Sequence, residues 1–177
     1  MNESHFTDPS LWDGEVLYLP RPTGRSQMIA TVHAYWHGRR GGKKFPTRGD
    51  IDPLALGPAL LPYLSLVTIE RDPFRVQYRL VGTEVARFYG AEMRGRWVDQ
   101  MNDIWPHQDI VDTHETYRRI VESGAPQFGL SLIEWQERPD HIFEFARFPI
   151  AEDGTTITHC LGLDDFTMIE PARGCAV

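Results

Sequence analysis

Cysteine is scarce in this chain, whose 177 residues include only Cys160 and Cys175. Two cysteines do not build the disulfide framework of a small secreted domain, so we expect both to be reduced thiols. No apolar run approaches the roughly 20 residues that a membrane-spanning helix needs. Residues 1–10 lack the basic and apolar regions of a signal peptide. These absences argue against a membrane or secreted protein and predict a cytoplasmic location.

Catalytic sequence motifs are also missing. The chain contains no G-x-S-x-G, G-x-x-x-x-G-K-[ST], G-x-G-x-x-G or C-x-x-C. His33 and His37 have the spacing of two helical zinc ligands, but Ala34 stands where the zinc proteases have glutamate, and no third ligand is identifiable. His159 adjoins Cys160, yet neighbouring strand residues point to opposite faces of a sheet. We therefore predict no catalytic residue and no metal ligand.

Positive charge is in the minority, with a formal net charge of −7. A nucleic-acid binder needs a basic face, so we expect no nucleic-acid partner. The one basic cluster is a glycine-rich loop between Arg39 and Arg48, which we interpret as a solvated loop. Whether this loop binds an anion stays open.

What the chain does contain is the composition of one globular domain, with 41% apolar and 24% charged residues. We expect an arm over 1–25, a single domain over 26–169 and a tail over 170–177. Hydrophobic periodicity and turn residues predict helices over 26–39, 54–61, 83–89 and 107–122. They predict strands over 63–70, 74–81, 127–135, 141–151 and 155–166, with a tight Asp153-Gly154 hairpin turn between the last two.

The order of these elements predicts an α+β fold. Two strands, then helices, then three strands join most simply in one antiparallel sheet with the intervening helices on one face. In 107–122 the predicted apolar stripe contains Ile110, Val111, His114, Tyr117 and Val121, so His114 is the one ionisable residue within it.

One segment has an unusually specific helix-start signal. Asp52 precedes Pro53, and aspartate as N-cap with proline at the first helical position favours a helix. We interpret Arg48, Asp50 and Asp52 as a structural motif, in which Arg48 pairs with one of the two carboxylates.

These residues belong to a larger pattern. The chain resembles a family of stand-alone bacterial PAS-like domains, described mostly from alphaproteobacteria, over residues 28–166. The resemblance depends on four segments: Arg39-Arg40-Gly41, Pro46-x-Arg48-x-Asp50-Ile51-Asp52-Pro53, Leu61-Pro62 and Arg79-Leu80-Val81-Gly82-Thr83.

The resemblance implies a five-stranded antiparallel sheet in the order 2-1-5-4-3, with a pocket between sheet and helices and an N-terminal flanking helix. It also implies a non-catalytic sensory or regulatory domain that binds a small ligand, a signalling protein, or both. The flavin-photosensor cysteine is absent from 82–89, and the sequence around His114 does not resemble a haem sensor. We therefore expect no cofactor, although an unidentified small molecule remains possible.

Several aromatic residues should converge on the centre of such a domain. Packing in the core explains most of them, and a subset would line an apolar ligand cavity. His114 is either a satisfied core histidine or a group that orients the ligand. The candidate ligand-binding residues are Tyr78, Phe88, Trp97, His114, Tyr117, Phe128 and Phe143.

A small enzyme with a cone-shaped pocket is the alternative. His114, His141 or His159, together with Asp140 or Asp164, would then supply acid–base chemistry. The discriminating observation is whether two of these groups lie within hydrogen-bond reach inside one pocket.

The predicted helix over 26–39 carries a stripe that includes Tyr35 and Trp36. Such a stripe must be buried against the chain's own sheet or against another molecule. PAS domains often dimerise through a flanking helix, so we expect a homodimer. An unknown signalling protein is the other expected partner, and no membrane partner is expected.

Overall fold

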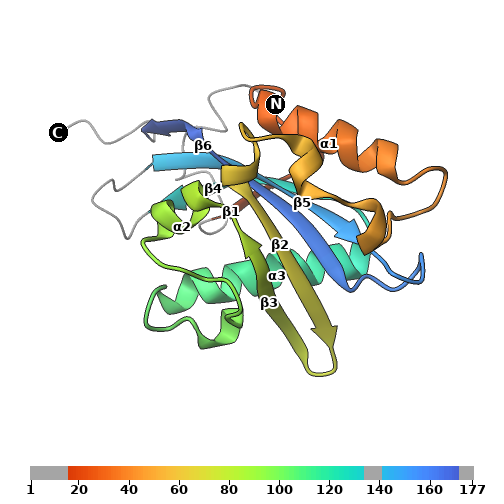
Figure 1. Cartoon of the computed structure of the whole chain (residues 1–177). Helices are drawn as coiled ribbons and strands as arrows, with labels where there is room; N and C mark the ends of the chain where they lie inside the picture. The colour runs from red at the N-terminus through yellow and green to blue at the C-terminus, as the bar shows by residue number, and fades with distance from the viewer. Residues whose placement is uncertain (1–15, 134–140, 172–177) are drawn as a thin grey trace.

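The computed structural model describes residues 16–133 and 141–171 of the chain. Residues 172–177 of the expected tail and 1–15 of the expected arm lie outside these ranges, as do Asp140 and Cys175. The predicted α+β class with a single antiparallel sheet is confirmed (Figure 1).

The sheet has six strands, one more than predicted. They are β1 (Val16–Leu19), β2 (Leu64–Arg71), β3 (Phe74–Val81), β4 (Gln127–Ile133), β5 (His141–Ile150) and β6 (His159–Pro171). The order β1-β4-β5-β6-β2-β3 contains the predicted order of the last five. The extra strand, β1, pairs antiparallel with β4, and its successive side chains point to opposite faces of the sheet.

The helices between the two groups of strands lie on one face of the sheet, as predicted, and the N-terminal helix covers the other face. Helix α1 (Gln27–Arg39) packs on one face, while α2 (Thr83–Tyr89) and α3 (His107–Ser123) lie on the other (Figure 1). Ile29, Val32 and Trp36 of α1 are buried, and the Trp36 indole donates a hydrogen bond of 2.8 Å to the Pro149 carbonyl. The apolar stripe of this helix is thus buried against its own sheet. The argument for a dimer through α1 loses its premise, and the homodimer remains a prediction.

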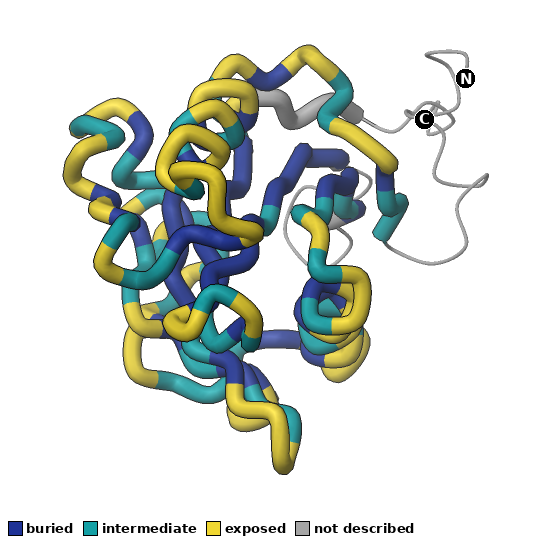
Figure 2. Tube along the Cα trace, turned by 90° about the vertical axis from the view of Figure 1, so that its right-hand side faces the viewer, coloured by how far each residue is buried: buried dark blue, intermediate teal, exposed yellow. Residues whose placement is uncertain are grey.

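Because side chains alternate along each strand, each core residue of the sheet faces either α1 or the pair α2 and α3. Along β5, Phe148 stacks near His33 and Trp36 of α1, whereas Phe143 and Phe145 point to the opposite face. Figure 2 shows the buried residues concentrated along the middle of the molecule, with exposed residues at the tip of the β2–β3 hairpin. The α2/α3 face is therefore a layer of its own, separate from the α1 face.

The predicted helix over 54–61 is wrong. Two short 3₁₀ turns, Pro53–Leu56 and Leu61–Tyr63, replace it. Gly57 has φ of 81°, a left-handed conformation that ends a helix, and Pro58 disfavours helix at the residue before it. The start signal itself is present, because the Asp52 carboxylate accepts a hydrogen bond of 3.0 Å from the Leu54 amide.

The residues of the structural motif bind mainly to backbone groups. Arg48 donates to the Ile51 carbonyl at 2.7 Å, so the expected pairing of Arg48 with a carboxylate is wrong. Asp50 instead accepts from the side chain of Lys43 and from the amide and hydroxyl of Thr47. These bonds lower the pKa of Asp50 far below its usual range, with the Lys43 contact the largest cause.

We expect Asp52→Ala to lower the free energy of unfolding by about 1 kcal/mol, because it removes the cap acceptor for Leu54. Thermal and urea denaturation measure the change. Asp52→Asn is the matched control, since it keeps an acceptor oxygen and should retain most of the stability. Equal stability of the wild type and Asp52→Ala would show that the carboxylate does not stabilise this turn.

The structure also differs from two further predictions, the turn before β6 and the apolar stripe of α3. The tight Asp153-Gly154 hairpin is wrong, because β5 ends at Ile150 and β6 begins at His159. The Asp153 carboxylate accepts from the Thr155 and Thr156 amides and organises a longer loop. On α3, Val111 is 43% exposed, so the buried face is rotated away from the predicted stripe towards Thr116 and Ile120.

Candidate functional site

A cavity of about 60 Å³ lies between α3 and the sheet. Three groups of residues surround it: one face of α3, the inward positions of β1, β4 and β5, and two aromatic residues from the α2–α3 region. The lining residues are Val16, Tyr89, Trp105, Asp109, Asp112, Thr113, Thr116, Tyr117, Ser131, Phe143, Phe145 and Arg147.

Sequence spacing explains why these side chains meet. Phe143, Phe145 and Arg147 alternate along β5 and so share the face towards α3. Asp109, Asp112, Thr113, Thr116 and Tyr117 recur at helical spacings of three and four, which places them on one side of α3.

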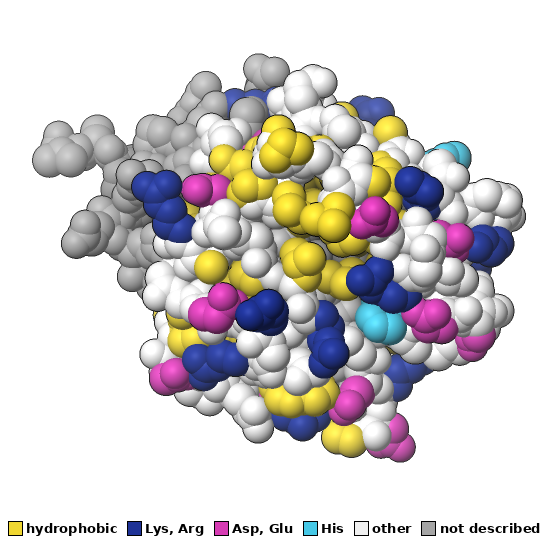
Figure 3. Space-filling model, viewed as in Figure 1, with side chains coloured by type: hydrophobic (Ala, Val, Ile, Leu, Met, Phe, Trp, Pro, Cys, Tyr) yellow, Lys and Arg dark blue, Asp and Glu magenta, His cyan; other side chains and the backbone are white. Residues whose placement is uncertain are grey.

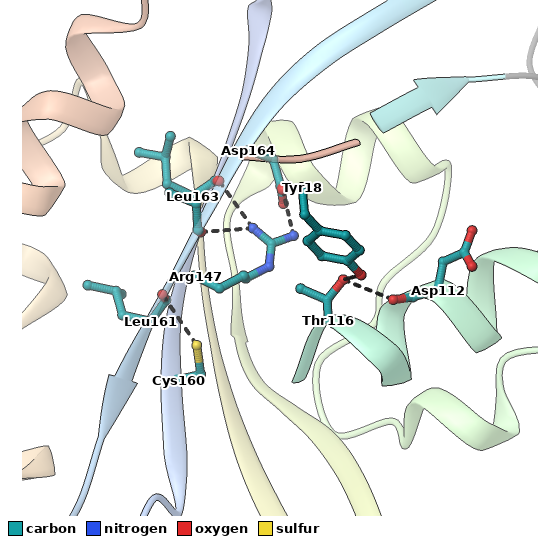
Figure 4. Close-up of polar contacts among 9 residues, drawn as sticks. Tyr18, Asp112, Thr116, Arg147, Cys160, Leu161, Leu163 and Asp164 are labelled. Atoms are coloured by element: carbon teal, nitrogen blue, oxygen red, sulfur yellow. Dashed lines mark hydrogen bonds and ion pairs between the residues drawn. The ribbon is translucent and has the colours of Figure 1, made fainter. Parts of the chain in front are cut away.

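A buried ion pair adjoins the cavity through Arg147, one of the lining residues. Arg147 donates to an Asp164 carboxylate oxygen at 2.6 Å, and both side chains are almost fully buried. Arg147 also donates to the backbone carbonyls of Ala146 and Leu163, as Figure 4 shows for Leu163 and Asp164. Burial raises the pKa of the Asp164 carboxyl, and the guanidinium opposes that rise.

Two aromatic side chains that line the cavity carry buried polar groups without a hydrogen-bond partner among the described residues. The Tyr117 hydroxyl and the Trp105 indole nitrogen make no hydrogen bond among the described residues, although these residues are only 1% and 4% exposed. The Tyr78 side chain interacts with Tyr117, but no hydrogen bond of normal length and angle joins the Tyr117 hydroxyl to a described residue. Burial raises the pKa of Tyr117 well above its usual value, so its hydroxyl is protonated at neutral pH. Buried polar groups of this kind normally bind water or a ligand.

Carboxylates stand on the α3 side of the cavity. One Asp112 oxygen accepts from the Gln108 side chain at 2.8 Å, while the other is buried without a hydrogen-bond partner among the described residues. Burial raises the pKa of Asp112. Next to it, the Thr116 hydroxyl donates to the Asp112 backbone carbonyl and also bonds to the Tyr18 hydroxyl, which ties α3 to β1 (Figure 4).

A cavity between a helix and an antiparallel sheet fits the fold that the sequence motifs imply, and a comparison with family models decides the family. The model described as a PAS domain matches residues 25–163. The chain belongs to the PAS domain family. Comparisons with curated proteins and with solved structures find no significant match. PAS domains are generally sensory, non-enzymatic domains of signalling proteins, and in this one no helix within residues 16–133 and 141–171 could cross a bilayer.

The PAS domain brings only part of the predicted ligand set together. Tyr117 and Phe143 line the cavity. Tyr78 packs edge-on against Trp105, and Phe88 packs against Phe143, so these two lie just behind the lining.

The other three predicted ligand residues lie elsewhere. Trp97 stacks under the Arg75 guanidinium beside β3. Phe128 lies on the opposite face of the sheet, against His33 of α1. His114 contacts Phe74 on the outer flank of α3, where burial lowers its pKa.

The groups invoked for the enzyme alternative do not assemble in the described part of this PAS domain. Asp164 is paired with Arg147, no histidine lines the cavity, and His159 lies 3.9 Å from Glu152 at the start of β6. Asp140 and the side chain of His141 lie outside the described part of the chain.

Sequence reasoning missed Arg147, Asp109, Asp112 and Trp105 as lining residues. A signal existed for Arg147, because a charged residue continues the apolar alternation Phe143-x-Phe145 on a central strand. Such a charge must be paired when buried, and β6 offers Asp164 on the same face.

A separate apolar depression lies on the outer surface of the PAS domain. Leu54, which is 71% exposed, stands at its rim. Figure 3 shows hydrophobic side chains gathered on this face of the molecule. The depression is lined by Leu54, Pro58, Leu61, Pro62, Leu80, Val81, Gly82 and Thr83, which includes much of the sequence motif of the family.

Proposed function

We propose that this PAS domain is a non-catalytic cytoplasmic sensor that binds a small polar molecule in the cavity between α3 and the sheet. The observation that carries the proposal is that the buried polar groups of Tyr117 and Trp105, which line one cavity, have no hydrogen-bond partner in the described part of the chain. Leaving such groups unsatisfied costs about 1–3 kcal/mol each. A ligand that bonds to them would therefore bind the folded domain with a favourable contribution from both.

Two buried carboxylates connect the sheet to the start of α1. Through them, ligand binding in the cavity could change the position of α1 on the opposite face of the sheet. Glu144 accepts hydrogen bonds from the Thr23 amide and hydroxyl at 2.9 and 2.7 Å. Asp165 accepts from the hydroxyl of Ser26, which is also the N-cap of α1. Glu144 lies on β5 between two cavity-lining residues and points to the other face, so a shift of β5 would move the start of α1.

In this proposal the signal leaves through a protein contact, with a second copy of the chain or with a signalling protein. A ligand would act by changing the relative free energies of two arrangements of α1 on the sheet. The size of the shift is limited by the difference in ligand affinity for the two arrangements.

A thermal-shift screen of small metabolites tests the proposal. Thr113→Phe places a ring into the cavity from α3, and Thr31→Phe, at an exposed position of α1, is its matched control. We expect compounds that raise the melting temperature of the wild type and of Thr31→Phe but not of Thr113→Phe. Hits that stabilise all three proteins equally would place binding outside the cavity and contradict the proposal.

A further inference from the structure

Negative charge exceeds positive charge around the cavity. Arg147 is the one basic residue among its lining residues, and its charge is balanced by Asp164 at 2.6 Å. Asp112 also lines the cavity, and one of its oxygens is buried without a hydrogen-bond partner among the described residues, so the lining favours a cation over an anion.

The groups without partners show what the ligand must offer. The buried Asp112 oxygen accepts hydrogen bonds and lacks a donor among the described residues. The Trp105 indole donates only, and the protonated Tyr117 hydroxyl donates as well. Both lack an acceptor within residues 16–133 and 141–171. A ligand that satisfies all three carries N–H donors at one end and an oxygen acceptor at the other.

The walls and the volume restrict the ligand further. Five aromatic side chains line the cavity, and aromatic faces attract cations with about 0.5–2 kcal/mol each; they are Tyr89, Trp105, Tyr117, Phe143 and Phe145. The volume of about 60 Å³ holds about four to six water-sized groups, at roughly 10–15 Å³ for each.

The geometry points to a small primary ammonium compound with a neutral oxygen, of the amino alcohol class, as the ligand of this cavity. This inference rests on the proposed function and adds the chemistry of the ligand. The ammonium group would donate to Asp112 between the aromatic walls. The hydroxyl oxygen would accept from Tyr117 and Trp105.

NMR titration of the ¹⁵N-labelled full chain, in an amine-free phosphate buffer, tests the inference. Ethanolamine is the probe. Propan-1-ol, in which a methyl group replaces the ammonium, and glycolate, which carries a negative charge, are the matched controls. We expect ethanolamine to shift the amide signals of α3 and of Phe143 to Arg147, and the controls to shift them at least about tenfold more weakly.

Variants of α3 add a second arm. Asp112→Asn removes the negative charge at the proposed ammonium site, and Glu122→Gln removes the same charge from an exposed position of the same helix. We expect Asp112→Asn to weaken ethanolamine binding about tenfold or more and Glu122→Gln to leave it unchanged.

The outcomes distinguish the ligand class, an amino alcohol, from the proposed function, a ligand cavity. Binding of propan-1-ol or glycolate at the cavity residues, without binding of ethanolamine, would overturn the amino alcohol class while supporting a ligand cavity. Equal loss of ethanolamine binding in Asp112→Asn and Glu122→Gln would overturn the direct ammonium contact. If none of these probes shifts the cavity residues, the amino alcohol class is wrong; if the metabolite screen with Thr113→Phe is also negative, the proposed function fails as well.

Discussion

Arg147→Met is expected to lower the free energy of unfolding by about 3–5 kcal/mol. The substitution leaves the Asp164 carboxylate buried with no positive partner among the described residues, since its ion pair there is the 2.6 Å contact with Arg147. The Leu163 and Ala146 carbonyls lose a donor at the same time. Urea denaturation at neutral pH measures the loss.

Two controls identify the cause. Arg147→Met combined with Asp164→Leu removes both charges, and it should recover most of the loss, because an apolar pair of similar volume replaces a buried ion pair at little cost. Arg75→Met breaks the more exposed ion pair with Asp99 and should change stability by only about 0–1 kcal/mol. Similar losses for Arg147→Met and Arg75→Met would contradict a special role for the buried pair.

The loss in Arg147→Met should also depend on pH. Burial raises the pKa of Asp164 in the folded protein, and the variant lacks the guanidinium that opposes this rise. The folded state therefore binds a proton at higher pH than the unfolded chain does, so acid favours the folded variant. The stability difference between variant and wild type should shrink as the pH falls through the folded pKa towards about 3.9, the ordinary aspartate value.

Gly82→Ala should destabilise the domain by at least about 3 kcal/mol. A Cβ at this position would lie 2.6 Å from the Leu61 carbonyl oxygen and closer still to the backbone of Pro62. Backbone atoms cannot turn aside as a flexible side chain can, and the Gly82 amide is itself hydrogen-bonded to the Leu64 carbonyl at 2.8 Å. This contact explains why Leu61-Pro62 and Gly82 belong to one sequence motif.

Gly38→Ala is the matched control for this prediction. No atom lies within 4 Å of a Cβ added there, and the position is in α1, so alanine should be neutral or stabilising by up to about 1 kcal/mol. Thermal melting compares the two variants. A melting temperature of Gly82→Ala equal to that of the wild type would show that the two backbones are not in close contact.

The sequence predicted five strands and their order because each strand alternates or is strongly apolar, and because the motifs indicated the fold. β1 was not predicted as part of the sheet, because four residues before a proline-rich stretch give little signal without the partner β4. The prediction of a helix over 54–61 is wrong because the backbone preferences of Gly57 and Pro58 override the apolar pattern of the segment.

The cavity was harder to predict than the fold. Phe128 and Phe143 both lie on central strands, yet they point to opposite faces, and only the pairing of β4 with β5 fixes which face each occupies. The Arg147–Asp164 pair likewise depends on the register of β5 against β6. Residue type could therefore suggest which aromatic residues are candidates for the cavity lining, but it could not show which of them lie together around the cavity.

Native mass spectrometry of the full chain, mixed with a stabilising compound from the screen, tests the ligand cavity most directly. The account predicts a complex of protein and one small molecule for the wild type and for Thr31→Phe, and the bare protein for Thr113→Phe. The same spectra report whether the chain is a homodimer. A complex of equal abundance in Thr113→Phe, or bare protein throughout, would contradict the account.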